Sequence, residues 1–176
     1  AGGRFQEYDQ YAGKGRPFTA NTDSNGQKWV PRAGLVYRYT DALSFYGSYT
    51  ESFKPNSTIA PLDNKMVIDG SIAPEESKSW ELGAKLDMPG RITANVALFD
   101  IHKRNVLVSI TEGATSIYSV AGKVRSRGLE MDLSGQLTEQ WSLIGSYAYT
   151  DAEVTEDPTY KGKFLQNVAK NSVSVS

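Results

Sequence analysis

Residues 79–88 read Ser-Trp-Glu-Leu-Gly-Ala-Lys-Leu-Asp-Met, and this stretch decides the fold. Apolar side chains stand at every second position from Trp80 to Met88, and the positions between them are small, polar or charged. Strict alternation is the pattern of a β-strand that has one apolar and one polar face. The stretch therefore predicts a strand whose two faces meet different surroundings.

The same period of two recurs along the chain. The segments that show it are 33–39, 43–49, 91–101, 129–133 and 141–149. No segment carries an apolar stripe of helical period over three turns. The sequence therefore predicts an all-β fold of about eight strands, with no long helix.

Composition excludes several classes of function. The 176 residues include 19 basic and 20 acidic side chains, so the formal net charge is -1 and a nucleic-acid partner is not expected. The chain has no cysteine, which excludes disulfides, zinc fingers, iron–sulfur clusters and thiol catalysis. No apolar run approaches the roughly 18 residues that a membrane-spanning helix needs.

Motifs for catalysis or metal binding are incomplete. The stretch that begins at Asn21 imitates a calcium loop, but Arg32 occupies the twelfth position, where a glutamate is required. Glu75 and Glu76 are better explained as the solvated start of a strand than as the acids of a glycosidase. His102 has no nucleophile in a G-x-S-x-G setting. We therefore expect no enzyme: no catalytic residue, no metal ligand and no resident cofactor.

The connections between the predicted strands alternate in length. Short turns are expected at 40–42, 88–90 and 137–139, and long loops at 12–28, 52–76, 102–116 and 152–170. In an antiparallel up-and-down meander, successive connections lie at opposite ends of the sheet. The short turns then share one rim and the long loops share the other, which is typical of outer-membrane barrels.

The strand faces favour a membrane barrel over a soluble one. Trp141 lies next to a short turn, whereas Tyr147 and Tyr149 lie at the opposite end of the same strand, as in the aromatic girdles of membrane barrels. The other face is polar, which indicates a wide lumen that eight strands cannot enclose. The chain is thus expected to be part of a larger barrel. Two alternatives stay open: a complete small eight-stranded outer-membrane barrel, and a soluble β-barrel or sandwich that acts as a binding module.

Six short stretches resemble strands of TonB-dependent siderophore receptors, and their order and spacing match over about residues 28–155. These stretches are 31–37, 49–55, 80–85, 98–101, 127–132 and 145–152. Within that family the likeness is greatest to receptors of the ferric-hydroxamate (ferrichrome) type.

The resemblance implies a 22-stranded transmembrane β-barrel in the bacterial outer membrane, with an N-terminal plug domain. Residues 1–176 would be a partial barrel domain from its later half, without the plug, the TonB box or the final strands. The chain departs locally from the family at Ala169 and Asn171, where relatives often have proline and histidine.

The resemblance also implies uptake of a ferric siderophore, driven through contact of the plug with the TonB complex, in a wall that faces outer-membrane lipid. Phe53, Tyr118, Tyr160 and Phe164 are the candidate ligand contacts, because they lie at the long-loop rim and flat aromatic faces suit a chelate. The iron would arrive already chelated, as transported ligand, and would need no protein ligands.

Overall fold

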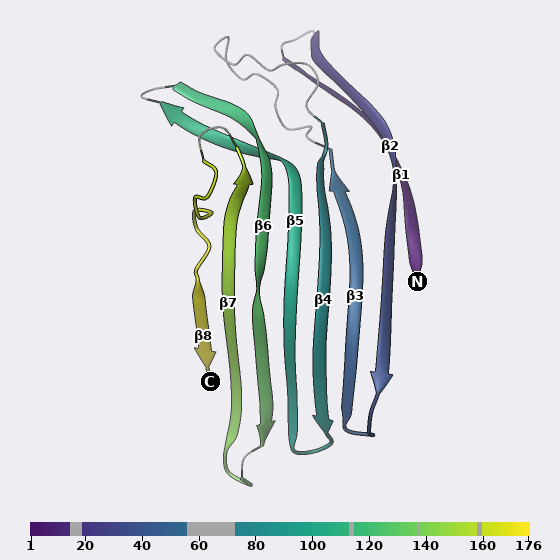
Figure 1. The fold of residues 1–176 in the computed structure, drawn as a ribbon, viewed down its shortest axis with the longest axis vertical. Coiled ribbons are helices and arrows are strands. Elements are labelled where there is room, and N and C mark those ends of the chain that lie inside the picture. Colours follow the sequence, from purple (N-terminus) through teal and green to yellow (C-terminus); the bar gives the residue numbers. More distant parts are fainter. Residues whose placement is uncertain (15–18, 56–72, 113–114, 137, 158–159) are drawn as a thin grey trace.

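A computed structural model shows one antiparallel sheet of eight strands in the order β1 to β8 (Figure 1). It describes residues 1–14, 19–55, 73–112, 115–136, 138–157 and 160–176, with side chains for all of these except 10–14, 19–24, 107–112 and 115–121. The strands are β1 (Gly2–Lys14), β2 (Thr19–Arg38), β3 (Leu43–Lys54), β4 (Glu75–Met88), β5 (Ile92–Glu112), β6 (Thr115–Gln136), β7 (Ser142–Glu156) and β8 (Asn171–Val175). The all-β prediction is confirmed, and each strand pairs with its neighbours in sequence.

Tight turns close three hairpins at one end of the sheet (Figure 1). They join β2 to β3, β4 to β5 and β6 to β7, where short turns were predicted. Between β4 and β5 the amide of Arg91 donates to the carbonyl of Met88 at 3.0 Å, and Gly90 supplies a φ of 71°. That dihedral lies in the left-handed region, which glycine adopts without steric cost.

Two of the predicted long loops are largely strand. β1 reaches Lys14 and β2 begins at Thr19, so a loop over 12–28 was wrong; β5 reaches Glu112 and β6 begins at Thr115, so a loop over 102–116 was also wrong. Ladder pairing continues where the apolar alternation stops. Polar residues stand at successive positions near the start of β2, whereas apolar residues stand at the successive positions 106–108 of β5, so neither extension shows a period of two. Much of the predicted loop 52–76 lies outside the described residues.

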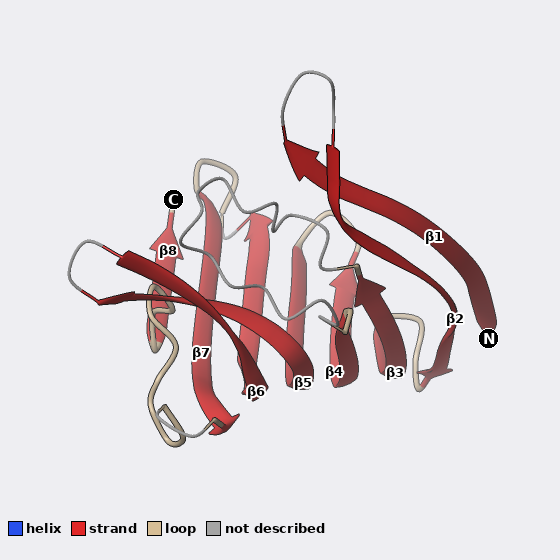
Figure 2. Ribbon diagram, turned by 90° about the horizontal axis from the view of Figure 1, so that it is seen from above, coloured by secondary structure: helices blue, strands red, loops and turns tan. Residues whose placement is uncertain are grey.

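The hairpin of β1 and β2 bends away from the rest of the sheet at the end opposite the tight turns (Figures 1 and 2). β2 pairs with β3 only over Arg32–Arg38, and its earlier residues pair with β1 alone. Tyr8 of this hairpin packs on Phe53 at the end of β3, with the ring centroids 5.7 Å apart. The hairpin therefore covers the end of β3.

The sheet is open, and the described part buries few apolar side chains. The strand order runs from β1 to β8 without a pairing between those two strands in the described part, which contradicts a complete eight-stranded barrel. No large side chain there is fully buried, whereas Trp80 and Leu82 are 60% and 66% exposed. A soluble fold would bury them, so the soluble alternative is also contradicted. No helix among the described residues is long and apolar enough to cross a membrane.

Candidate functional site: the two faces of the barrel wall

One face of the sheet is a continuous apolar band. Cross-strand partners share a face, and the row Leu82, Leu98, Leu129 and Tyr149 runs across β4 to β7. Along β4 the band extends from Trp80 to Met88, about 26 Å at roughly 3.3 Å per residue. A β-strand that crosses a bilayer at a tilt of about 45° needs roughly 9–11 residues. This face therefore has the length and chemistry of a lipid-facing wall, and we call it the outer face.

The opposite face, here the inner face, is mainly polar. Its rows pair Ser48 with Glu81, Asn95 with Asp132, and Asp132 with Ser146. Two small residues on this face are buried: Ala97 and Ala152 are each 4% exposed. Side chains on the concave side of a curved sheet converge, which explains this crowding. Apolar residues on this face include Val36 and Ile144, which are exposed, and Phe99, the partner of Glu81.

A polar cluster on the inner face is built around Tyr46. Its ring crosses β4 above Gly83, and its hydroxyl lies 3.4 Å from Oδ1 of Asn95 on β5. Glu81 lies on the same face of β4, opposite Ser48 on β3. The inner carboxylates Glu130 and Asp132 form no salt bridge within the described part of the chain. The inner face thus presents hydrogen-bond acceptors to the lumen.

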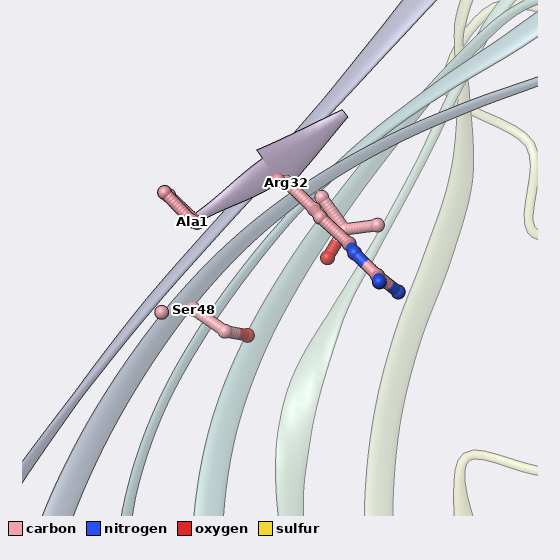
Figure 3. Close-up of a pocket in the computed structure, with 7 residues that line it drawn as sticks. Ala1, Arg32 and Ser48 are labelled. Atoms are coloured by element: carbon pink, nitrogen blue, oxygen red, sulfur yellow. The ribbon is translucent and has the colours of Figure 1, made fainter. Parts of the chain in front are cut away.

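A shallow hollow lies on the same face where β1, β2 and β3 meet (Figure 3). Its floor is made by small residues, including Gly2, Gly34 and Ser48, and Arg32 extends along it. Small side chains leave the guanidinium of Arg32 open to solvent. The hollow therefore places an exposed cationic group on the inner face, which also carries Arg38 and Lys85 near the short turns.

The three predicted ligand contacts whose side chains the structure describes do not form one cluster. Phe53 is 7% exposed beneath Tyr8 at the end of β3. Phe164 lies on the connection after β7, forms an isolated bridge with Glu153 and is 64% exposed. The Nζ of Lys170 lies 5.3 Å from the centroid of the Phe164 ring, within cation–π range.

The other two candidates, Tyr160 and Tyr118, lie on different parts of the chain. The amide of Tyr160 donates to Oδ1 of Asp157 at 2.8 Å, which fixes the first turn after β7. Tyr118 pairs with Ser109 in the β5–β6 ladder, and its side chain lies outside the described residues. Ligand contact by all four stays a prediction. The sequence did not identify the Tyr46 cluster or Arg32 as site residues. Alternation indicated only that these residues lie on the polar face.

The described residues contain no group of three or more histidine, aspartate or glutamate side chains arranged to hold a metal ion.

The match to a protein family covers the whole chain. The family model described as "TonB dependent receptor-like, beta-barrel" matches residues 1–176. The chain belongs to the TonB-dependent receptor β-barrel family. Members of this family are outer-membrane proteins, so the apolar outer face is a lipid-facing surface of the outer membrane.

Known TonB-dependent receptors resemble the chain in sequence and in structure. It is 35% identical to the metal-pseudopaline receptor CntO of Pseudomonas aeruginosa and covers 25% of that protein with 99% of its own length. It is also 35% identical to the ferrichrome outer membrane transporter/phage receptor of Escherichia coli K12, with 99% of the chain on 22% of that protein. The unliganded ferric citrate transporter FecA superposes with a TM-score of 0.77 at 26% identity, over 98% of this chain and 26% of that one. The chain thus spans about a quarter of the length of these relatives.

Proposed function

We propose that this chain is a wall segment of a TonB-dependent outer-membrane importer for a ferric siderophore. One observation carries the proposal: the exposed apolar band and the polar inner face are the two sides of a transmembrane barrel wall, in a chain that belongs to this receptor family. Residues 1–176 form a partial barrel domain in this proposal, and a separate plug domain fills the lumen.

The inner face supports a role in holding cargo or plug rather than in catalysis. Glu81, Glu130 and Asp132 offer acceptors, and Arg32 offers a cationic group. Such mixtures bind a chelate through a few directional contacts and orient it. The proposed importer therefore needs no resident cofactor and no nucleic-acid partner, and iron enters as a chelated ligand.

The chemical type of siderophore is a separate matter. Two relatives with the same 35% identity are named for different ligands, metal-pseudopaline and ferrichrome. The hydroxamate type indicated by the sequence motifs stays a prediction, supported by the second relative and not by the first.

The test uses the full-length receptor, in cells that lack their own siderophore receptors. Uptake of radioactive iron is measured with ferrichrome and with ferric pseudopaline as probes. The proposal expects uptake of at least one probe, which stops when TonB is deleted while surface binding persists. Uptake that is equal with and without TonB would contradict active import and indicate a passive pore.

A further inference from the structure

Two exposed arginines share the inner face at the base of the β1–β2 hairpin. Gly2 pairs with Arg32 and Arg4 pairs with Val30, so the two arginines are diagonal neighbours on adjacent strands. The Cα atoms of such neighbours lie about 7–8 Å apart, within reach of long side chains. The Nε atom of Arg32 lies 3.5 Å from the place that a Cβ of Gly2 would take, so its side chain reaches across to β1. We call Arg4 and Arg32 the arginine pair.

The arginine pair lines a hollow of about 310 Å³. Val30 and Thr50 line it as well, and Thr50 is the partner of Arg32 on β3. This hollow adjoins the one in Figure 3, because Arg32 and Thr50 border both. Thr50 stands two residues from Ser48 of the inner face, so both hollows lie on the lumen side of the wall. A volume near 300 Å³ is sufficient for part of a small ligand.

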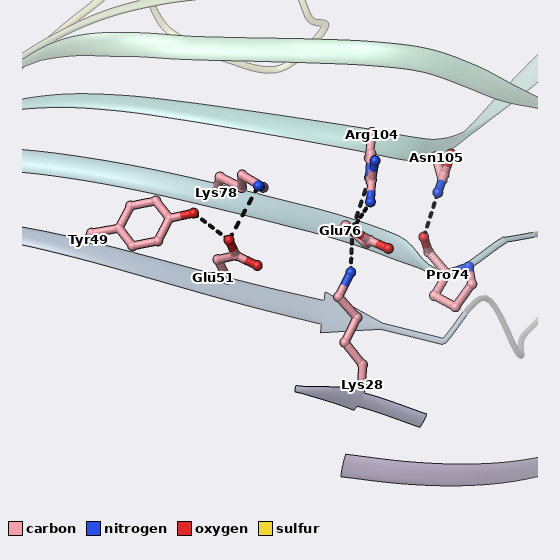
Figure 4. A network of polar contacts seen from close by, with 8 residues as sticks. All are labelled: Lys28, Tyr49, Glu51, Pro74, Glu76, Lys78, Arg104 and Asn105. Atoms are coloured by element: carbon pink, nitrogen blue, oxygen red, sulfur yellow. Dashed lines mark hydrogen bonds and ion pairs between the residues drawn. The ribbon is translucent and has the colours of Figure 1, made fainter. Parts of the chain in front are cut away.

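The carboxylates at this end of β3 and β4 are already bound by other bases (Figure 4). Glu51 also borders the hollow, but it accepts hydrogen bonds from the Tyr49 hydroxyl and pairs with Lys78 at 3.3 Å on the outer face. Glu76 pairs with Lys28 of the hairpin. These acids therefore have partners other than the arginine pair.

The arginine pair has no counter-charge within the part of the chain that the structure describes. Neither guanidinium forms a salt bridge with a described residue. Beyond Glu81, toward the long connections, the described strands place one carboxylate on the inner face, Glu75, and Lys103 binds it at 3.1 Å. Two guanidinium groups at this spacing repel each other. An anion bound between them would relieve that repulsion.

The site lies where incoming cargo would first meet the wall. Arg32, Thr50 and Ser79 form one row of the inner face. Ser79 precedes Trp80, which ends the apolar band on the side of the long connections. In outer-membrane barrels that side is extracellular. Glu81 lies deeper on the same face, so an anion would be held at the mouth of the lumen.

The chemistry of the arginine pair identifies the group that it would bind. A guanidinium has five N–H donors in a planar fork that matches a carboxylate. We propose that the arginine pair binds a free carboxylate of the siderophore, so that the receptor selects an anionic chelate. The inference rests on the proposed import function and names the chemical class of its cargo. A ferrichrome-type chelate is neutral, because its hydroxamates balance the charge of Fe(III), and it would leave the arginine pair without a partner.

The test measures the affinity of the purified full-length receptor for three iron complexes. They are ferrichrome, a ferrichrome derivative with a carboxylate added away from the iron, and ferric citrate. The parent is expected to bind at least one of the two complexes that carry carboxylates. The double variant Arg4→Gln, Arg32→Gln should weaken that binding about tenfold or more, which is the effect of losing one hydrogen bond between charged groups. Any affinity for ferrichrome should stay at the parental value.

Two control variants separate local charge from general effects. Arg38→Gln, Lys85→Gln removes the same charge from the same face, in the row next to the short turns, and should keep the parental affinities. Arg4→Lys, Arg32→Lys keeps the charge but not the planar fork, and should restore part of the binding. If the double glutamine variant does not fold, the single variant Arg4→Gln carries the same test.

Several results would overturn the inference. One is failure of the parent to bind either carboxylate-bearing complex, and another is unchanged binding in the double variant. An equal loss for ferrichrome would assign the arginine pair to a carboxylate of the plug or to the fold. Displacement of the carboxylated ferrichrome by an equal concentration of acetate would assign it to any free carboxylate.

The result for the arginine pair is separable from the result for import. TonB-dependent uptake by a double variant with parental affinities would leave the importer proposal standing and overturn only the selection of anionic chelates. Uptake that does not need TonB would contradict active import, whatever the arginine pair binds.

Discussion

Tyr46 lies across Gly83 on the inner face, and its ring fills the space that a Cβ at Gly83 would occupy. Its hydroxyl then reaches Asn95 on the next strand. One side chain thus spans β3, β4 and β5, and the crossing requires a residue without a side chain. Aromatic rings that cover strand glycines in this way help to fix the register of a sheet.

Replacing Gly83 with alanine should destabilise the barrel by about 1–2 kcal/mol, since the added methyl displaces the Tyr46 ring from its place. Thermal unfolding of the full-length receptor in detergent measures the effect. Gly145→Ala is the control, because its added Cβ meets only the Ser174 carbonyl at 3.9 Å. In a Tyr46→Ala background the penalty of Gly83→Ala should vanish. An equal penalty in both backgrounds would refute the role of the ring.

A charge placed on the outer face should be far more costly than one on the inner face. Val96 lies in the middle of the apolar band, between Ala84 and Met131. Val96→Arg should cost about 2–4 kcal/mol, as basic residues do at the bilayer midplane of barrels. Ser146→Arg is the control on the inner face, where Asp132 is its cross-strand neighbour. Heat-modifiable migration of the full-length receptor from membranes reports the folded fraction, and similar losses in both variants would be the contrary result.

Acid should release the β1–β2 hairpin from the end of β4. Burial raises the pKa of Glu76, but hydrogen bonds from Lys28 and Arg104 outweigh it and hold the pKa below its ordinary value of 4.5. A depressed carboxylate pKa means that the contact stabilises above the ordinary value and is lost as pH falls through the lowered one. The contact should therefore be complete at neutral pH and weaken only below about 4.5.

Spin labels at Asn25 and Ser52 measure this release in the full-length receptor. Their distance distribution should broaden as pH falls below the ordinary carboxylate range. Glu76→Gln should be broad at every pH, whereas Glu75→Gln should behave like the parent, because Glu75 pairs with Lys103 and not with the hairpin. A Glu76→Gln receptor that keeps a narrow, pH-dependent distance would disprove the link.

Among the predicted ligand contacts, Phe164 and Phe53 should respond differently to truncation. Phe164 is exposed, so Phe164→Ala should weaken siderophore binding by roughly three- to tenfold without loss of thermal stability. Phe53 is covered by Tyr8, so Phe53→Ala should lower the thermal midpoint. Binding of ferrichrome and of ferric pseudopaline to cells provides the measurement. Unchanged affinity for every bound probe would remove Phe164 from the site.

The sequence was informative where the membrane imposes a period of two. Between Trp80 and Met88 each residue contacts either lipid or lumen, and alternation therefore predicted both the strand and its faces. Beyond the apolar band, residues such as Asp23 and Asn25 of β2 have low strand propensity, and the successive apolar residues 106–108 of β5 break the period of two. The extensions of β1, β2, β5 and β6 were therefore missed.

The inner site was less predictable than the fold. The contact of Tyr46 with Gly83 depends on the register between β3 and β4, which alternation within either strand does not fix. The covering of Phe53 by Tyr8 depends on the departure of the β1–β2 hairpin from the sheet. Both contacts join residues far apart in sequence, so only the assembled sheet reveals them.

The central claim, that the apolar face meets lipid and the polar face meets the lumen, is tested most directly by a spin-label scan of residues 80–86 in the full-length receptor in lipid vesicles. The chain contributes no cysteine of its own to such a scan. Accessibility to oxygen, which concentrates in lipid, should peak at positions 80, 82, 84 and 86 and fall at 81, 83 and 85. Peaks at the odd positions, or no period of two, would contradict the claim.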